Sequence, residues 1–244
     1  MKQVVLPAVL ALSLTAFASA AHAQSFNEGF DAGSIPDGWV LTNNSQPAQN
    51  DWSVTTGITD NDGIVVVNPQ AGPSFAVTNY TAVGGSSGPI SNWLISPLIS
   101  GLNNGDTFNF YTTTTPGSSY PDRMEFRLST AGNSTDVGSS ATSVGDFSSV
   151  LVNINPDLQV GGYPDSWTMY TGTVAGLTGP ADGRVAFRYN VTDGGVNGSN
   201  SNVIGLDTFS YVAAVPEPAS WALTLFGVCG LLGLQGIRRR ARRG

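Results

Sequence analysis

The chain has 244 residues and an acidic balance, with seventeen acidic against ten basic residues and a formal net charge of −7. Charged residues make up 11% of it, and its single histidine and single cysteine are His22 and Cys229. This composition excludes an intrachain disulfide and zinc sites built from several His and Cys residues, and its acidity disfavours nucleic acid or anionic lipid as a partner.

The first 23 residues have the order of parts found in a secretory signal peptide. An early lysine supplies the positive charge, residues 4–17 form the apolar stretch, and 21–23 offer small residues where a signal peptidase cleaves. We expect cleavage after Ala23, which leaves a domain that begins at Gln24. The alternative is an uncleaved membrane anchor, for which the apolar stretch is short.

Between residues 24 and 214, apolar residues alternate with polar ones in several short runs, with the period of half-buried β-strands. The clearest alternation covers 124–128 and 185–191, and no stretch has the spacing of a long amphipathic helix. Further strands are predicted at 64–67, 93–95, 108–110, 150–154 and 204–212. Many short strands with turn-rich connections predict an all-β sandwich or barrel of antiparallel strands.

The last 30 residues consist of three parts in a fixed order. A rigid tetrapeptide is followed by an apolar stretch, 219–237, and then by a cluster of arginines. The tetrapeptide is Val215, Pro216, Glu217 and Pro218, and the arginines are Arg238, Arg239, Arg240, Arg242 and Arg243. As a transmembrane helix, 219–237 is just long enough to cross a hydrocarbon core of ~30 Å. The arginines would then stay in the cytoplasm, with the domain on the other side of the membrane.

This tail resembles the PEP-CTERM sorting signal, because all three of its parts occur in the right order within 215–244. In that family an exosortase, a membrane transpeptidase-like enzyme, recognises the tail in Gram-negative bacteria that make extracellular polysaccharide. The resemblance implies transient anchoring in the inner membrane, removal of the tail, and arrival at the cell surface or in the extracellular matrix. A permanent single-pass anchor is the alternative.

Several motifs within 24–214 resemble the choice-of-anchor J domain. The clearest are FNEGFD at 26–31, IPDGW at 35–39 and NWLISPLI at 92–99, and weaker ones lie at 127–130, 184–189 and 204–209. The resemblance implies a jelly-roll-like sandwich related to cleaved-adhesin and MAM-like domains, attached to varied surface-anchoring tails. Segment 132–165 matches no pattern of the family, so its strand pairing is not predicted.

Removal of both ends would leave a domain with few kinds of reactive side chain. It keeps four arginines and sixteen acidic residues, a net charge of −12, and has no lysine, histidine or cysteine. Nucleophilic systems that need histidine, cysteine or lysine are therefore excluded, and carboxylates are the ordinary acid–base groups that remain. Of its two glutamates, Glu125 lies between Arg123 and Arg127 on the polar face of a predicted strand, where we expect an exposed ion pair.

Calcium is the metal that suits this composition, because it prefers hard oxygen ligands. The first and last strands of a jelly-roll sandwich often lie side by side, which would bring Glu28 or Asp31 towards Asp207. We therefore consider a structural calcium site formed by these three residues. A domain without any cofactor is the alternative.

Three functions compete for this domain. The first is that of a non-enzymatic, exosortase-sorted surface or matrix protein associated with exopolysaccharide. The second is that of a carbohydrate-binding module, because Trp52, Trp167, Tyr120 and Tyr163 lie in polar, turn-rich surroundings where their rings can stack on sugars. Trp52 and Trp167 are the predicted platform. The third is that of a glycosidase or lyase built on a carboxylate pair.

Overall fold

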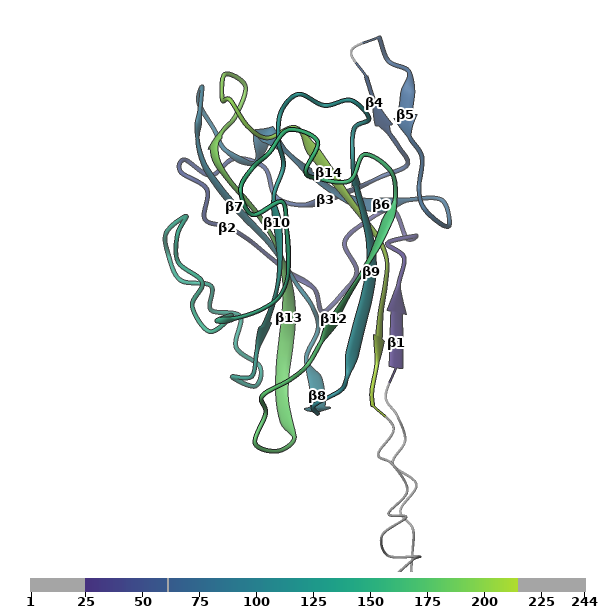
Figure 1. Ribbon diagram of the computed structural model, residues 1–244, viewed down its shortest axis with the longest axis vertical. Helices are drawn as coiled ribbons and strands as arrows, with labels where there is room; N and C mark the ends of the chain where they lie inside the picture. Colours follow the sequence, from purple (N-terminus) through teal and green to yellow (C-terminus); the bar gives the residue numbers. More distant parts are fainter. Residues whose placement is uncertain (1–24, 61, 215–244) are drawn as a thin grey trace, which may run out of the picture. The chain divides into compact units, whose positions relative to one another are not determined.

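Two antiparallel sheets stack face to face in the part of the chain that the computed structural model describes, residues 25–60 and 62–214 (Figure 1). The predicted signal peptide at 1–23, and the predicted tail at 215–244 with its membrane helix and arginines, lie outside these residues. Within the described ranges, no helix combines the length and the apolar character needed to span a membrane.

Each sheet contains six strands. The first sheet has the order β12 (Thr168–Thr173), β9 (Thr107–Thr114), β14 (Val203–Val212), β6 (Phe75–Asn79) and β3 (Ser53–Thr55), and β1 (Ser25–Glu28) also pairs with β14. The second sheet has the order β11 (Ser149–Ile154), β10 (Met124–Ser129), β13 (Ala181–Gly194), β7 (Gly88–Ile95) and β2 (Val40–Asn43), and β8 (Ile99–Leu102) also pairs with β13.

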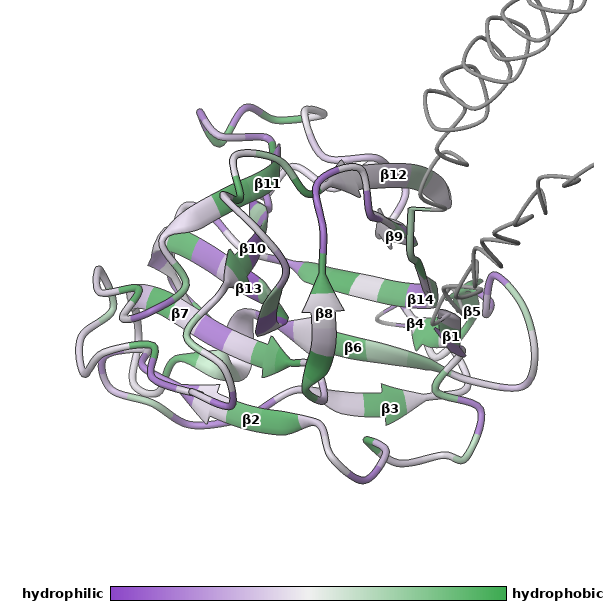
Figure 2. Ribbon diagram, turned by 90° about the horizontal axis from the view of Figure 1, so that it is seen from below, coloured by the Kyte–Doolittle hydropathy of each residue, from purple (hydrophilic) through white to green (hydrophobic). Residues whose placement is uncertain are grey.

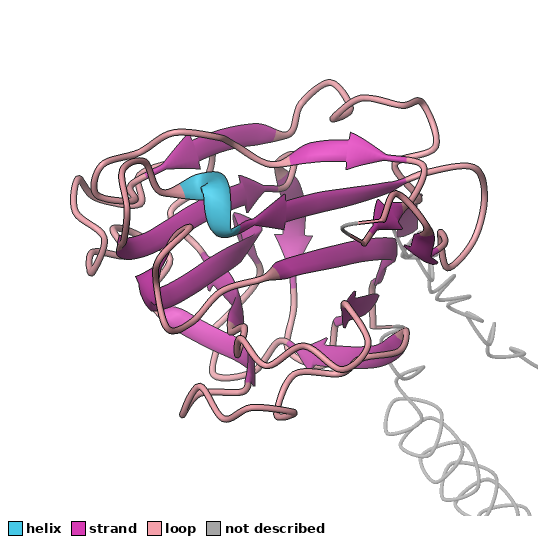
Figure 3. Ribbon diagram, turned by 90° about the horizontal axis from the view of Figure 1, so that it is seen from above, coloured by secondary structure: helices cyan, strands magenta, loops and turns pink. Residues whose placement is uncertain are grey.

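Two smaller elements lie outside these sheets. β4 (Ile58–Thr59) and β5 (Val65–Val67) form a separate hairpin, which projects from one end of the domain in Figure 1. A single 3-10 turn, η1 (Tyr80–Ala82), is the helical element of the described residues, as Figure 3 shows. Both follow directly after strands of the first sheet, and both contribute to the site described below.

An aromatic cluster fills the space between the sheets. Phe126 of β10 packs against Phe187 of β13, with ring centroids 4.7 Å apart, and against Phe110 of β9 at 5.1 Å. Phe108 of β9 and Phe209 of β14 stack at 6.0 Å. All five side chains are fully buried. Because the rings come from both sheets, their packing fixes one sheet against the other.

The polar face of β10 is also buried, which corrects the prediction of an exposed ion pair. Glu125 accepts hydrogen bonds from Arg127 Nε at 2.7 Å and from Arg188 Nη1 at 2.9 Å, and none of these side chains is more than 11% exposed. Arg123 donates to the carbonyl oxygen of Asn190. Figure 2 shows hydrophilic and hydrophobic segments interleaved along the strands of this sheet.

The long connection between β10 and β11 covers this polar face. Arg127 donates to the carbonyl oxygen of Phe147 at 2.9 Å, and Arg188 donates to that of Ala141 at 2.6 Å. The ring of Phe147 packs against Trp93 of β7, with centroids 5.9 Å apart. A charged cluster therefore lies between the sheet and a loop, because the arginines satisfy backbone carbonyl groups of that loop.

The two ends of the described chain meet at one end of the domain (Figure 1). β1 pairs with β14 so that Ser25 lies opposite Val212. The carboxylate of the buried Asp106 accepts hydrogen bonds from the hydroxyl of Tyr211 at 2.9 Å and from the backbone N–H of Ala214 at 2.8 Å. The chain is thus held by the domain up to the last residue before the tail begins.

The structure confirms the predicted fold class, an antiparallel β-sandwich. Predicted strands at 124–128, 150–154 and 204–212 correspond to β10, β11 and β14. β12 was not predicted, because most of its residues are exposed and it has no alternating apolar pattern.

Glu125→Ala is expected to lower the free energy of unfolding by about 3 kcal/mol, because two arginines would stay buried without a counter-charge. Burial by itself raises the pKa of Glu125, but Arg127 and Arg188 outweigh this effect and lower it, so the native carboxylate is ionised. Urea denaturation of a 24–214 fragment measures the change. Asp62→Ala removes the same charge from an exposed position. This control should cost less than about 0.5 kcal/mol, and equal losses in the two variants would contradict the prediction.

Candidate functional site

The two tryptophans predicted to form a sugar-binding platform do not share a surface. Trp52 is buried in the main core with 2% exposure, and its Nε1 donates to the carbonyl oxygen of Asn92 at 3.2 Å. Trp167 is partly buried in another cluster, where its ring meets Phe75 edge-on at 5.2 Å and its Nε1 donates to the carbonyl oxygen of Asn68 at 2.8 Å. The prediction of an exposed Trp52 is wrong, because the inward packing of its ring outweighs its polar sequence neighbours.

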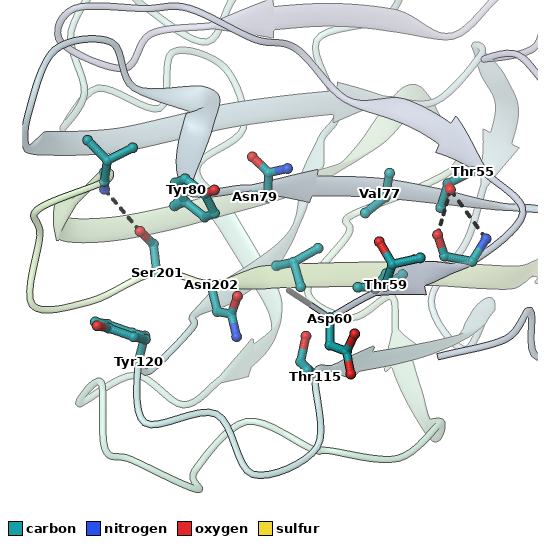
Figure 4. A pocket seen from close by; sticks show the side chains of 15 residues that line it. Thr55, Thr59, Asp60, Val77, Asn79, Tyr80, Thr115, Tyr120, Ser201 and Asn202 are labelled. Atoms are coloured by element: carbon teal, nitrogen blue, oxygen red, sulfur yellow. Dashed lines mark hydrogen bonds between the residues drawn. The ribbon is translucent and has the colours of Figure 1, made fainter. Parts of the chain in front are cut away.

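A hollow of about 660 Å³ opens on the face of the first sheet that points away from the main core (Figure 4). Its floor includes Val77 of β6 and Val203 of β14, and its sides come from the β4–β5 hairpin, the loop after β9 and the segment before β14. We call this hollow the outer groove. Its lining residues are Thr55, Gly57, Ile58, Thr59, Asp60, Val77, Asn79, Tyr80, Thr115, Tyr120, Gly195, Val196, Ser201, Asn202 and Val203.

Tyr80 and Tyr120 supply the exposed aromatic surface of the outer groove, with 36% and 51% of their areas accessible. Figure 4 shows both rings towards one end of the groove, with Ser201 between them in this view and Asp60 towards the other end. Tyr120 was among the aromatic residues that the sequence indicated for sugar stacking. Tyr163, also in that set, is 3% exposed and belongs to the core.

Backbone hydrogen bonds fix the position of Tyr80. It is the first residue of η1, whose N-cap residue, Asn79, accepts a hydrogen bond from the N–H of Thr81 at 2.8 Å. The N–H of Tyr80 donates to the carbonyl oxygen of Asn202 at 2.8 Å. This bond ties the end of β6 to the start of β14, so the backbone that carries the ring is held on both sides.

The loop that carries Tyr120 is tied to the same place. Ser118 Oγ accepts hydrogen bonds from the N–H of Tyr120 at 3.2 Å and from Asn202 Nδ2 at 2.9 Å. The carbonyl oxygen of Pro121 accepts from the N–H of Ser201 at 3.0 Å. Ser201 has a φ of 73°, in the left-handed region that non-glycine residues seldom adopt. Such a conformation persists where surrounding contacts hold it, and it is frequent at binding sites.

A buried carboxyl group, Asp122, joins this end of the groove to both sheets. It is 0% exposed. Its Oδ1 accepts hydrogen bonds from the N–H of Asn202 at 2.8 Å and from the hydroxyl of Tyr189 at 2.5 Å, and its Oδ2 lies 2.7 Å from Thr114 Oγ1. Thr114 belongs to β9 and Tyr189 to β13. Asp122 therefore connects the sandwich with a residue that lines the groove.

Burial raises the pKa of Asp122 from 3.8 to about 6, although hydrogen bonds from Tyr189, Asn202 and Thr114 oppose the shift. The geometry agrees with a protonated carboxyl group. Thr114 Oγ1 lies 2.7 Å from both Asp122 Oδ2 and the carbonyl oxygen of Val203, yet it has a single proton to donate. If Asp122 is protonated it donates to Thr114, which then donates to Val203. Ionisation leaves one of these acceptors without a hydrogen bond.

Of the residues predicted to bind calcium, Asp207 is already engaged by backbone N–H groups. Its Oδ2 accepts from Gln70 at 2.9 Å and from Ala71 at 3.1 Å, and its Oδ1 accepts from Thr208 at 2.6 Å. Burial raises the pKa of Asp207, and these hydrogen bonds oppose the shift. A cation at Asp207 would therefore compete with donors that already occupy both oxygens.

The other two predicted calcium ligands have different neighbours. Glu28 Oε1 accepts a hydrogen bond from the N–H of Phe30 at 2.6 Å. The carboxylate of Asp31 lies against Gly72, where a Cβ atom would overlap it. No group of three acidic, His or Cys side chains among residues 25–60 and 62–214 is placed to hold a metal ion. Calcium therefore stays a prediction.

The outer groove has one carboxylate in its lining, that of Asp60. Glu125 is engaged with arginines under the β10–β11 connection. Hydrolysis of a glycoside by two carboxylates requires a pair about 5–10 Å apart on either side of the scissile bond. Among the described residues the lining supplies one carboxylate and no such pair.

Tyr80, Asn202 and Asp122 were not predicted as site residues. Tyr80 did have a local signal in the sequence. The residue before it, Asn79, is of a type that often caps the start of a helical turn, and such a turn places the following ring where the chain changes direction. Asp122 has no local signal. Two of its three hydrogen-bond partners, Tyr189 of β13 and Asn202 before β14, are 67 and 80 residues away in the sequence and meet it only in the folded domain.

The tail matches a known sorting signal. The family model for the PEP-CTERM protein-sorting motif matches residues 214–243, so the chain carries this motif at its C-terminus, as the sequence indicated. The match shares only Ala214 with the domain. No curated protein sequence is significantly similar to the chain.

The domain is similar in structure to cleaved adhesin domains of Lys-gingipain. The K1 and K3 domains from Porphyromonas gingivalis W83 share 19% and 18% sequence identity with it, with TM-scores of 0.51 and 0.52. The alignments cover 78% and 77% of this chain and 99% and 98% of those domains. The K2 domain is similar to the same extent, with 18% identity and a TM-score of 0.50. This likeness confirms the adhesin-like fold expected from the sequence.

Asp122→Asn is expected to flatten the pH dependence of stability. The native pKa of Asp122 lies above its unfolded value, so its contribution is fully present below pH 3.8 and is lost as the pH rises through about 6. The loss amounts to about 3 kcal/mol. Asparagine stays neutral and can still donate to Thr114.

Urea denaturation of the wild-type and variant 24–214 fragments at several pH values between 4 and 7 gives the free energy of unfolding as a function of pH. Other carboxyl groups, including Asp207, contribute equally to the curves of both proteins. Asp62→Asn, at an exposed position, is the matched control. Parallel curves for wild type and Asp122→Asn would refute the assignment.

Proposed function

We propose that this protein is exported through a signal peptide, held transiently in the inner membrane of a Gram-negative bacterium, and transferred by an exosortase to the cell surface or extracellular matrix. The PEP-CTERM protein-sorting motif at 214–243 carries the proposal. The match includes the tetrapeptide at 215–218, the apolar stretch at 219–237 and the terminal arginines. Signal peptidase would act at the other end of the chain, after Ala23.

The described end of the domain supports a separate sorting tail. β14 ends at Val212, and Asp106 still accepts a hydrogen bond from the N–H of Ala214. The matched motif covers the residues from there onwards. Removal of the tail would therefore leave every strand of both sheets in place.

We infer that the domain acts without catalysis. Residues 24–214 contain no histidine, cysteine or lysine, so the common nucleophile systems lack their bases. The outer groove adds one carboxylate, Asp60, without a second to pair with it. A groove lined by tyrosine, amide and hydroxyl groups suits the binding of a ligand that is not chemically altered.

A second proposal is that the domain is a carbohydrate-binding module that binds the exopolysaccharide outside the cell. The exposed rings of Tyr80 and Tyr120, on the sides of one groove, favour it. Trp52 has no part in this, because it is buried. Nucleic acid is an unsuitable partner for a domain that carries sixteen acidic residues and four arginines.

Structural calcium is proposed at the junction of the first strand with the loop around Gly72. Glu28 and Asp31 are its ligands in this proposal, because they lie at and just after the end of β1, Asp31 lies against Gly72, and calcium prefers carboxylate oxygens. Asp207 contributes less, since its oxygens accept three backbone N–H groups. The ion would hold β1 in place, with no role in catalysis.

Alanine substitution of Pro216, Glu217 and Pro218 together is expected to stop maturation, because these residues form the rigid part of the motif that the exosortase recognises. The precursor should accumulate in the inner membrane, and the shorter processed form should disappear from the cell surface. Immunoblots of membrane and surface fractions from the native host measure this. Ser220→Ala, in the same tail, is the control that should mature normally. Normal maturation of the triple variant would disprove exosortase sorting through this motif.

Millimolar calcium is expected to raise the melting temperature of the chain. A ligand at ten times its Kd stabilises the native state by about 1.4 kcal/mol, which corresponds to a few degrees for a domain of this size. Scanning calorimetry with calcium and with a chelator measures the shift. Asp31→Asn should abolish it and Asp62→Asn should keep it. An unchanged melting temperature in millimolar calcium would end the proposal.

A further inference from the structure

We propose that the outer groove binds a segment of an uncharged polysaccharide, with the rings of Tyr80 and Tyr120 stacked on its sugars. This inference rests on the proposed carbohydrate-binding function and assigns it a site and a class of ligand. The predicted tryptophan platform does not supply such a site, because Trp52 lies in the core. The outer groove does, because its volume of about 660 Å³ is typical of ligand-binding hollows.

The aromatic side chains of the groove are placed to meet a ligand. Tyr120 is 51% exposed and Tyr80 is 36% exposed, although both backbones are held by hydrogen bonds. Val196, 63% exposed, lies in the same lining. Sugars present apolar C–H faces as well as hydroxyl groups, and flat aromatic rings cover such faces while their edges remain in water. Three exposed apolar side chains in one polar hollow fit a ligand of this mixed character.

The polar groups of the lining are amides and hydroxyls with unused hydrogen-bonding capacity. Asn79 uses its Oδ1 to accept from Thr81, which leaves its Nδ2 hydrogens without a partner among the described residues. Asn202 uses its Nδ2 to donate to Ser118, and its Oδ1 accepts no hydrogen bond from the described residues. One amide thus offers donors and the other an acceptor, from the adjacent ends of β6 and β14. Sugar hydroxyl groups pair with both.

The charge of the groove selects against anionic polymers. Asp60 is the one ionisable acid of the lining, and no arginine belongs to it. The domain as a whole has no lysine, and its sixteen acidic residues exceed its four arginines. A polymer of uronates or sulfated sugars would therefore bring negative charge to a negative surface without any cation to pair with it. A neutral polymer meets no such penalty and can donate hydroxyl hydrogen bonds to Asp60.

The end of the groove that carries the tyrosines is arranged before the ligand binds. Asn202 is fixed through its N–H to Asp122, through its carbonyl oxygen to Tyr80, and through its amide to Ser118. Ser201 keeps its left-handed backbone because Pro121 accepts from its N–H. Side chains that are already ordered lose little entropy on binding, which favours affinity for a flexible polymer.

A glycan array carrying neutral and anionic oligosaccharides tests the ligand class. The full-length protein is applied in a detergent without a sugar headgroup, so that the detergent does not compete for the groove. The neutral oligosaccharide that gives the strongest signal is then titrated against wild type, Tyr80→Ala, Tyr120→Ala and Tyr120→Phe. Met169→Ala is the matched control, because Met169 is 54% exposed and lies outside the lining.

Neutral oligosaccharides should bind and anionic ones should not. Each tyrosine-to-alanine change should raise the Kd about tenfold or more, whereas Tyr120→Phe keeps the ring and should stay close to wild type. Met169→Ala should bind as wild type does, and thermal melting should confirm that every variant is folded.

Three results would overturn the inference in different ways. A preference for anionic oligosaccharides would refute the ligand class. Unchanged binding by both alanine variants would refute the site and leave carbohydrate binding in place. Absence of any binding by the wild type would refute both the site and the carbohydrate-binding function.

Discussion

The domain depends on the packing of aromatic rings between its sheets, because no intrachain disulfide can form in a chain whose single cysteine is Cys229. Phe126 and Phe187 from the second sheet interlock with Phe110 and Phe209 from the first. Each fully buried phenylalanine stabilises the fold by about 2–3 kcal/mol. Because these rings come from both sheets, they fix one sheet against the other.

The outer face of the second sheet is covered by a loop, whereas the outer face of the first sheet carries an open groove, and this difference determines where a ligand can bind. On the second sheet, Glu125 and its two arginines are sealed beneath the β10–β11 connection, whose carbonyl groups they hold. On the first sheet, the connections form the sides of a groove and leave Val77 and Val203 as its floor. The arginines of the charged cluster hold the β10–β11 connection against one face, whereas the connections around the other face leave a hollow between them.

The sequence predicted the strands far better than it predicted what covers them. Alternation identified β10 and β13, because it records which residues share a face. Alternation cannot tell whether that face meets solvent, so it predicted an exposed Glu125, although the β10–β11 connection covers this side chain. The prediction that Trp52 forms part of a surface platform was wrong for the same reason, because its polar sequence neighbours do not show that its ring packs into the core. Tyr120, an aromatic residue in a polar turn, is 51% exposed, and its use for sugar stacking stays a prediction.

The long strand β14 gives the domain a mechanical axis. It begins at Val203, in the floor of the outer groove, and ends at Val212, just before the point where the sorting motif begins. Ten residues span about 33 Å at the usual rise of a strand. If a polymer bound in the groove were pulled against the C-terminal end of the domain, the force would act along β14. The hydrogen bonds that join β14 to β9, β6 and β1 would then be loaded in shear. Many hydrogen bonds would then have to break together, so tension is shared across the first sheet instead of peeling one strand away.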